Sequence, residues 1–247
     1  VTLSQAVDDA IAEGATIVNH SVQWFNTGRG DGTGGAGSPD ASVARARAHG
    51  IVWVNAAGNA ARTHWAGSFV DTNGNARHEF APGDEGNAMT ARPGAQLCLR
   101  LKWDEWPTSS SDYDLYLERT SDGAVLAWST NAQRTTPSPP AEMTCWTNTG
   151  ATDVSVEAVI TRVSATASPR LDLFTGARLQ FPVAAQSIVE PASSPAAIAV
   201  GAACWSGTAV QPYSSVGPTI DGRTKPDVVG PDAVSTLTFG PSTSCAT

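Results

Sequence analysis

Ile51-Val52-Trp53-Val54-Asn55-Ala56-Ala57-Gly58-Asn59 is an apolar run that ends in a glycine and a polar amide. A continuous apolar run of this length predicts a strand that is buried on both faces. A helical segment precedes it at residues 39–49 and is closed by Gly50. The same order occurs once before, with a helix expected at residues 3–13 and a buried strand at 17–21.

The first helix carries its own start and stop signals. Thr2 and Gln5 have the spacing of a capping box, and Gly14 is placed to end the helix. Its apolar face consists of Leu3, Val7, Ala10 and Ile11. Helices that alternate with continuously apolar strands predict a parallel sheet with right-handed crossovers, and so an α/β fold class.

The middle of the chain has a different period. From about residue 79 to 181, apolar residues alternate with polar ones, as is typical of antiparallel strands. The alternating sets are Leu97, Leu99, Leu101 and Trp103; Leu115 and Leu117; and Val154, Val156, Ala158 and Ile160. After Pro182 the earlier pattern returns with a buried strand at residues 197–203. We therefore expect one α/β domain in two parts, residues 1–78 and 182–247, with an antiparallel β-sandwich inserted at residues 79–181.

Composition excludes several classes of function. The 247 residues carry a formal net charge of −8 without a basic stripe, which argues against a nucleic-acid partner. The apolar runs are too short to span a bilayer, so no membrane partner is expected. The start has no signal-peptide pattern, and it begins in the middle of a fold, as expected for part of a longer protein.

The four cysteines leave two interpretations open. None of them forms a Cys-x-x-Cys pair, so a zinc site is not expected. Cys98 and Cys145 fall in the sandwich segment, whereas Cys204 and Cys245 fall in the last α/β segment. Two disulfides in that pairing would suit a secreted protein, and four buried thiols are the alternative.

Three segments in order resemble a known enzyme family. They are the run at residues 51–59, Thr224-Lys225-Pro226-Asp227-Val228-Val229-Gly230-Pro231, and Ser242-Thr243-Ser244-Cys245-Ala246 near the carboxyl end. Together they resemble the second half of a subtilisin-like serine protease, a subtilase, whose nucleophile box is Gly-Thr-Ser-x-Ala. The resemblance implies that Ser244 is the nucleophile and that the amide of Asn59 stabilises the oxyanion.

The same resemblance implies a substrate-binding site. Ser21-Val22-Gln23 matches the family's substrate-binding edge, usually Ser-Leu-Gly, and Ala56-Ala57-Gly58 would form the other wall of the specificity pocket. Gln23 and Ser242 both stand where the family usually has glycine. The first substitution changes the expected pocket size, and the second narrows the approach to the nucleophile.

The motifs for the other two triad residues are missing. The sequence has no Asp-Thr-Gly or Asp-Ser-Gly in a first strand and no His-Gly-Thr on a helix. We therefore expect the triad Asp and His to lie upstream of Val1. The histidines that are present are interpreted as structural or surface residues: His20, His49, His64 and His78.

Other polar and aromatic residues leave alternatives open. Asp71, Asn73 and Asn75 offer oxygens at alternate positions, as in a calcium loop, but the segment has only one carboxylate and lacks the terminal Glu, so a polar turn is the favoured interpretation. Asp112 and Asp114 are a second weak calcium candidate. Six tryptophans either fill a sandwich core or line a sugar-binding face: Trp65, Trp103, Trp106, Trp128, Trp146 and Trp205. No other cofactor is expected.

The resemblance to subtilases covers about residues 1–60 and 185–247. The stretch at residues 111–117 also resembles the pre-peptidase jelly-roll modules that are often joined to secreted proteases. We therefore expect a partial three-layer subtilisin-like domain from a secreted endopeptidase, inactive as this chain alone and prone to self-association through its incomplete sheet. The alternatives are a binding or scaffold module whose sandwich engages glycan or protein, and a non-catalytic relative.

Overall fold

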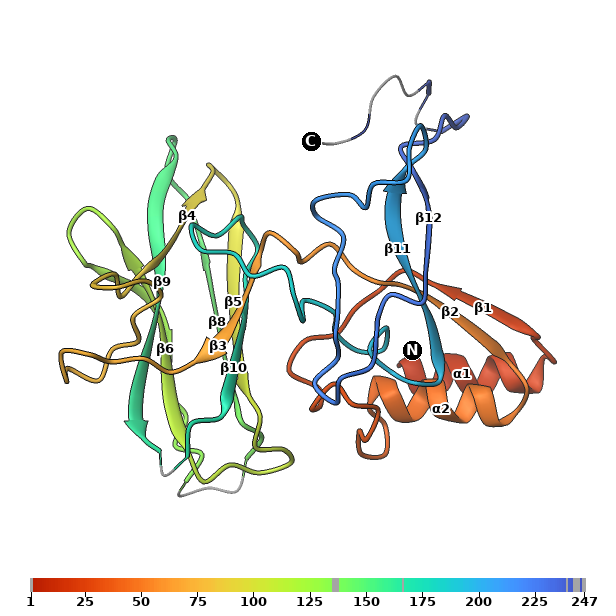
Figure 1. Ribbon diagram of the computed structural model, residues 1–247, viewed down its shortest axis with the longest axis horizontal. Helices are drawn as coiled ribbons and strands as arrows, with labels where there is room; N and C mark the ends of the chain where they lie inside the picture. The colour runs from red at the N-terminus through yellow and green to blue at the C-terminus, as the bar shows by residue number, and fades with distance from the viewer. Residues whose placement is uncertain (1, 135–137, 166, 239, 242–244, 246–247) are drawn as a thin grey trace. The chain divides into compact units, whose positions relative to one another are not determined.

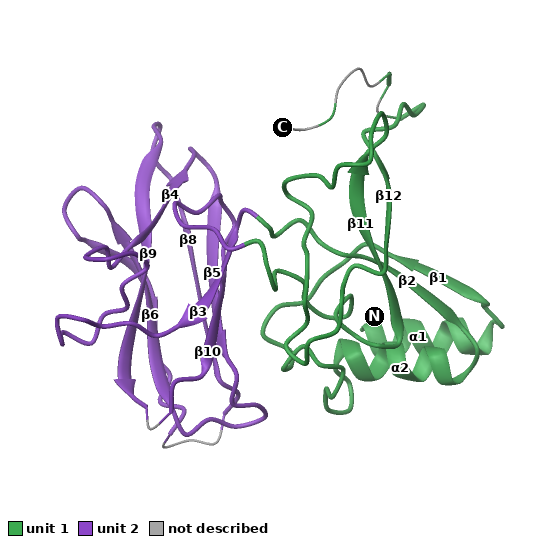
Figure 2. Ribbon diagram, in the orientation of Figure 1, with its two compact units in different colours: residues 1–61, 184–247 green, residues 62–183 purple. Residues whose placement is uncertain are grey.

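A computed structural model describes residues 2–134, 138–165, 167–238, 240–241 and 245 (Figure 1). It divides into two compact units, which Figure 2 colours separately. One unit consists of residues 1–61 and 184–247, and the other of residues 62–183. The chain thus leaves the first unit once and returns to it after forming the second.

The first unit contains a four-stranded parallel sheet in the order β1-β2-β11-β12. Its elements are α1 (Leu3–Ala12), β1 (Ile17–His20), α2 (Pro39–Ala48), β2 (Val52–Ala56), β11 (Ala197–Cys204) and β12 (Val228–Asp232). The Thr2–Gln5 capping box is present at α1, and Ser38 caps α2 ahead of Pro39. The parallel sheet expected from the sequence is confirmed.

Helices α1 and α2 lie beside each other on the same side of this sheet (Figure 1). The core between helices and sheet consists of Val7, Val43, Ala46, Ile51, Trp53 and Ala197. These residues come from both helices and the central strands, as the apolar pattern requires. The two edge strands keep apolar side chains exposed, with Ile17 on β1 at 65% and Val228 on β12 at 53% of full exposure.

The second unit is a sandwich of two antiparallel sheets, in the orders β3-β10-β5-β8 and β4-β9-β6-β7. Its strands are β3 (His64–Ser68), β4 (Asn87–Ala91), β5 (Gln96–Trp103), β6 (Asp112–Arg119), β7 (Val125–Ser129), β8 (Ala141–Thr147), β9 (Val154–Ser164) and β10 (Arg170–Phe174). The alternating leucines of β5 and β6 are buried in its core, so the period-two interpretation is confirmed.

The sandwich begins earlier than residue 79, where the sequence analysis placed its start. Strand β3 pairs along its whole length with β10, which brings His64 opposite Phe174. The unit also closes on itself, because Val183 N donates to His64 O at 2.8 Å and His64 Nδ1 donates to Val183 O at 2.7 Å. Residues 62–78 therefore belong to the sandwich.

A buried charged group connects the strands of the first sandwich sheet. Asp172 accepts from His64 Nε2 at 3.2 Å and from Arg170 Nη2 at 2.8 Å. Burial by itself raises the pKa of Asp172, but the hydrogen bond from His64 and the Arg170 charge hold it below its usual value. His64 is completely buried in the sandwich, where it has a structural role.

The tryptophans do not share one role. Trp65 and Trp103 are buried in the sandwich core, whereas Trp128 and Trp205 are exposed and belong to different units. Core filling is confirmed for the first pair, and the idea of a single tryptophan-lined sugar-binding face is wrong. Neither helix in the described part of the chain has the length and apolar character needed to traverse a membrane.

Both expected cysteine pairings are present as disulfides. Cys98 and Cys145 join β5 to β8 at directly opposed positions. Cys204 at the end of β11 is bonded to Cys245 across 41 residues of sequence. No free cysteine is found among the described residues.

Candidate active site

The expected substrate edge follows the carboxyl ends of two paired strands. His20 on β1 lies opposite Asn55 on β2, so residues 21–23 and 56–58 leave the sheet side by side. Ser21 and Val22 are exposed. The carboxyl ends of parallel strands are where α/β sheets usually bind ligands. The sheet therefore brings the two expected walls of the specificity pocket to the same edge.

Gln23 and Gly58 contact each other within this edge. Gly58 has a φ of +105°, and the side-chain oxygen of Gln23 occupies the space that a Cβ at Gly58 would need. That oxygen is buried and accepts no hydrogen bond within the described ranges. The Gln23 side chain thus fills the space beside Gly58. Its oxygen, which has no donor among the described residues, is directed at this space.

Asn59 lies between two fixed main-chain groups. Ser215 N donates to Gly58 O at 2.8 Å, and Ser215 Oγ accepts from Ala60 N at 2.9 Å. Ser215 itself is completely buried. Asn59 is exposed, and across the described residues its amide has no intramolecular partner. The result is a turn that Ser215 holds on both sides of Asn59 and that presents an exposed carboxamide.

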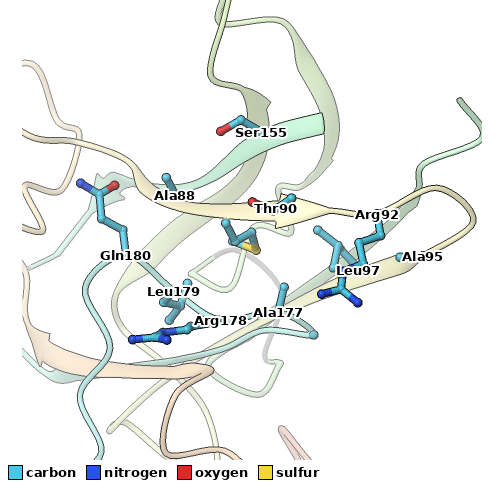
Figure 3. A pocket seen from close by; sticks show the side chains of 12 residues that line it. Ala88, Thr90, Arg92, Ala95, Leu97, Ser155, Ala177, Arg178, Leu179 and Gln180 are labelled. Carbon is cyan, nitrogen blue, oxygen red and sulfur yellow. The ribbon is translucent and has the colours of Figure 1, made fainter. Parts of the chain in front are cut away.

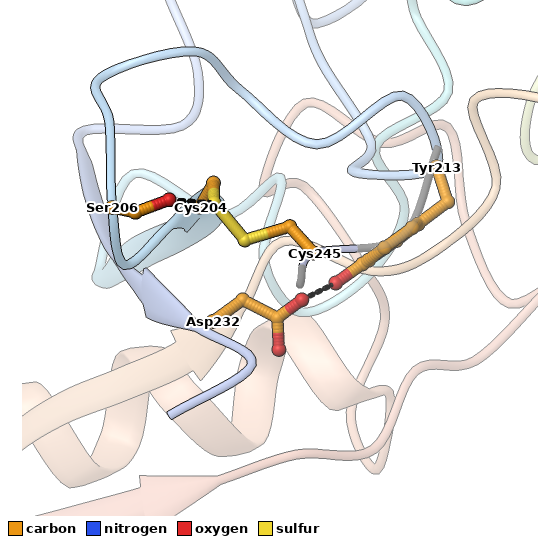
Figure 4. The surroundings of a disulfide bond; sticks show 5 residues. All are labelled: Cys204, Ser206, Tyr213, Asp232 and Cys245. Atoms are coloured by element: carbon orange, nitrogen blue, oxygen red, sulfur yellow. Dashed lines mark hydrogen bonds between the residues drawn. A yellow bond between two sulfur atoms is a disulfide. The ribbon is translucent and has the colours of Figure 1, made fainter. Parts of the chain in front are cut away.

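The segment next to Ser244 is attached to the end of β11. Figure 4 shows the Cys204–Cys245 disulfide with Tyr213 donating to Asp232, the last residue of β12. Burial, with the hydrogen bond to Asp232, raises the pKa of Tyr213 to about 12. Tyr213 O also accepts from Ala61 N at 3.1 Å, just beyond Asn59. Ser244 lies outside the described residues, as do Ser242, Thr243 and Ala246.

The quoted segment at residues 224–231 has a structural role in the sheet. Asp227 N donates to Ala199 O at 2.9 Å, and Asp227 Oδ2 accepts from Ala199 N at 2.7 Å. Lys225, buried, donates to Ala197 O at 2.8 Å and to Asp227 at 2.6 Å. These bonds align β12 beside β11 and so position the strand end that carries Asp232.

The four histidines have other partners. His20 donates to Asn55 Oδ1 at 2.6 Å and stacks on Trp24, whereas His49 contacts the last carbonyls of α2. His78 is buried in the sandwich, where burial lowers its pKa to about 4. With His64 in the buried Asp172 group and His49 exposed, the structure supports the interpretation that the four are structural or surface residues.

The calcium candidates do not fit a cation. Asp71 accepts main-chain N–H groups of Gly74, Asn75 and Ala76, and Asn73 and Asn75 donate their amide groups to Glu85. Their oxygens are thus directed at N–H donors, as in a polar turn. In the part of the chain that the structure describes, no group of three or more His, Cys, Asp or Glu side chains is arranged to hold a metal ion.

The second calcium candidate also lacks the required arrangement. A register shift separates Asp112 from Tyr113, and Asp114 accepts a hydrogen bond from Tyr116 at 3.0 Å. Burial raises the pKa of both aspartates. They are therefore two partly desolvated carboxyl groups of the sandwich.

Sequence reasoning missed Ser215, Tyr213 and Asp232. Each acts through a contact with a distant segment, such as Ser215 with Ala60 across 155 residues. A serine that bonds main-chain groups leaves no periodic signal in the sequence. Only the pairing of β11 with β2 and β12 brings these residues to the candidate site.

Comparisons with known proteins agree with this fold. The model of the subtilase family, Peptidase_S8, matches residues 1–246. The structure of the Clostridium perfringens CspB protease is similar, with a TM-score of 0.59 and 15% identity, over 93% of this chain and 51% of that one. The chain thus spans about half the length of that protease.

A second solved structure covers a smaller part of the chain. The pre-peptidase C-terminal domain of a collagenase from Bacillus anthracis has a TM-score of 0.32 and 10% identity, over 46% of this chain and 88% of that one. No curated protein matches significantly. Since the family model extends over almost the whole chain, the protein belongs to the subtilase family.

Proposed function

We propose that the chain is part of the catalytic domain of a secreted serine endopeptidase, with Ser244 as nucleophile and Asn59 as oxyanion donor. The observation that carries this proposal is the turn at Asn59, which Ser215 holds on both sides and whose exposed amide follows the strand next to the expected substrate edge. The Cys204–Cys245 disulfide supports it further, because it attaches the residue after Ser244 to the central strand β11.

In this proposal an extended peptide binds along residues 21–23, and the hydroxyl of Ser244 attacks its carbonyl carbon. A histidine accepts the hydroxyl proton and later donates it to the leaving amine, while an aspartate orients that histidine. The carboxamide of Asn59 donates to the oxyanion of the tetrahedral intermediate. In subtilisin itself, loss of the oxyanion asparagine lowers kcat about 10²- to 10³-fold.

The chain alone is proposed to be inactive because it offers no base to Ser244. His20 and His49, the histidines of the first unit, already contact Asn55 and the end of α2. The Asp and His then come from a further segment of the parent protein, which would also complete the three-layer domain. The sandwich, residues 62–183, is proposed to be an inserted jelly-roll module.

The deciding experiment uses a fluorophosphonate probe and a chromogenic peptide with both forms of the protein. The complete gene product should be labelled at Ser244 and cleave the peptide, and Ser244→Ala should abolish both. The 247-residue chain should show no turnover. Robust, Ser244-dependent turnover by this chain would refute the proposal that it lacks a base for Ser244. If the probe does not label the complete gene product, the protein is a non-catalytic relative.

Secretion is proposed from the cysteines, because both disulfides suit an oxidising compartment. A polypeptide substrate is the expected partner, and self-association through the sheet edges is expected for the isolated chain. The second candidate function, a binding or scaffold module, is favoured by one observation: Gln23 fills the space beside Gly58 in the expected pocket.

A further inference from the structure

The sandwich contains a groove that plays no part in the proposed hydrolysis. Its volume is about 670 Å³, and it lies between β4, the start of β5 and the loop after β10 (Figure 3). This volume is within the usual range for ligand sites, about 300–1,000 Å³. All of its lining residues belong to the second unit.

The floor of the groove is apolar. Met89, Leu97 and Leu179 line it, and each is at least 96% buried in the sandwich core. They come from both sheets and the loop after β10, so the floor is held by the packing of the sandwich itself. Aliphatic side chains of a ligand would lose water-exposed area against it.

The charges at the groove all have one sign. Arg92 and Arg178 are exposed lining residues, and no Asp or Glu lines the groove. Across the described residues, neither guanidinium has an ion pair or hydrogen bond. Figure 3 shows the two arginines apart from each other, with Ala177 between them in this view. In a chain of net charge −8, two unpaired arginines over an apolar floor favour a ligand with carboxylates.

The groove also has an open strand edge. Among the described strands, β4 is the last of its sheet and pairs only with β9. Ala88 O accepts from Gln180 N at 2.8 Å, so its main chain faces away from β9. In an antiparallel ladder, residues two apart face the same edge. Thr90 therefore presents its N–H and C=O to the groove, and in the described ranges nothing outside the sheet bonds to them.

We propose that this groove binds an extended acidic peptide segment, which adds to β4 at Thr90, lays aliphatic side chains on the floor and pairs its carboxylates with Arg92 and Arg178. Edge pairing supplies main-chain hydrogen bonds, and alternate side chains then supply selectivity. The charge of the lining is the observation that selects this occupant. The inference does not depend on catalysis by Ser244.

The test is a fluorescence-anisotropy titration of the whole chain with a short labelled peptide that alternates valine with aspartate and is blocked at both ends. Matched peptides carry asparagine or lysine in place of aspartate. The aspartate peptide should bind best, and added salt should weaken it. Equal binding of the aspartate and asparagine peptides would overturn the proposal.

Two variants locate the site. The double change Arg92→Gln and Arg178→Gln should weaken the aspartate peptide roughly tenfold. The control Arg47→Gln, an exposed arginine on α2, should leave binding unchanged. Thr90→Pro removes an N–H that does not bond to β9, and an edge strand tolerates proline at such a position. Because this N–H would bond to the peptide main chain, the variant should weaken binding of the aspartate and asparagine peptides alike. Thermal unfolding checks that each variant is folded.

If the double variant binds like the Arg47→Gln control, the proposal fails. It also fails if the aspartate peptide does not bind but a sulfated oligosaccharide does, and if binding of this oligosaccharide is lost in the double variant. The groove would then recognise a glycan. A binding loss in the arginine variant together with a normal unfolding temperature supports the peptide site.

Discussion

The side-chain oxygen of Gln23 lies where a Cβ on Gly58 would stand, so the residues that follow β1 and β2 interlock at the candidate substrate edge. Gly58 has a left-handed φ of +105°, which favours glycine. Gln23 thus depends on the absence of a side chain at residue 58.

Gly58→Ala should therefore lower the free energy of unfolding by about 1–3 kcal/mol, through the strained φ and the clash with Gln23. Urea unfolding measures this loss. Adding Gln23→Gly should recover part of it by removing the clash while the φ strain remains. Gly35→Ala, with open space around it, should cost much less. An equal loss at both glycines would contradict the interlock.

The Cys204–Cys245 disulfide should stabilise the first unit. Replacing both cysteines with alanine should lower the free energy of unfolding by about 2–4 kcal/mol, because the unfolded chain loses its cross-link. Hydrogen exchange should become faster in β11 and β12. Replacing Cys98 and Cys145 should instead affect β5 and β8. Unchanged hydrogen exchange in β11 and β12 would contradict this role. So would a complete gene product that the fluorophosphonate labels equally well with and without the Cys204–Cys245 disulfide.

His78 should make the sandwich sensitive to acid. Its pKa is about 4 in the folded protein, below the ordinary 6.5, because burial disfavours the charged ring. Between these two pKa values the unfolded chain binds a proton at His78 and the folded chain does not. The free energy of unfolding therefore falls as the pH drops from about 6.5 to about 4, by roughly 3 kcal/mol in total.

The variant His78→Gln should flatten this part of the pH dependence. Unfolding in urea, followed by hydrogen exchange of β3, reports on the same region, since the rings of His78 and Trp65 on β3 lie 4.7 Å apart. His49→Gln, at the exposed end of α2, is the matched control. Identical slopes for both variants between pH 6.5 and pH 4 would exclude His78 as the cause.

The edge strands of the parallel sheet should drive self-association of the isolated chain. Ile17 on β1 and Val229 on β12 are 65% and 48% exposed, and unpaired edges invite pairing with another chain. Light scattering with size exclusion should detect oligomers, and Ile17→Lys with Val229→Lys should reduce them. Val163→Lys, on an exposed position of the sandwich, should have no effect. A dilute, well-behaved monomer would count against the prediction.

Local signals made the first unit predictable. The capping box at Thr2 and the Ser38–Pro39 start lie within one turn of the helices that they begin. β12 was not predicted as a strand, because Gly230 and Pro231 interrupt its apolar pattern. It forms as an edge strand, where proline is tolerated, and is fixed by Asp227 bonding to Ala199.

The start of the sandwich was missed for a non-local reason. His64-Trp65-Ala66-Gly67-Ser68 does not alternate, and its first residue is a polar ring in the core. That burial depends on Asp172, 108 residues away. The residues of the candidate site were predicted from a family resemblance. The hydrogen bonds of Ser215 to Gly58 and Ala60 could not be predicted, because they depend on the folded sheet.

The hydrogen bonds between His64 and Val183 bring the two ends of the sandwich together. A domain whose two ends lie close together can be inserted into a loop of another domain without separating the residues on either side of that loop. We therefore expect that residues 62–183 can be exchanged for a short linker while the residues on either side keep their spacing.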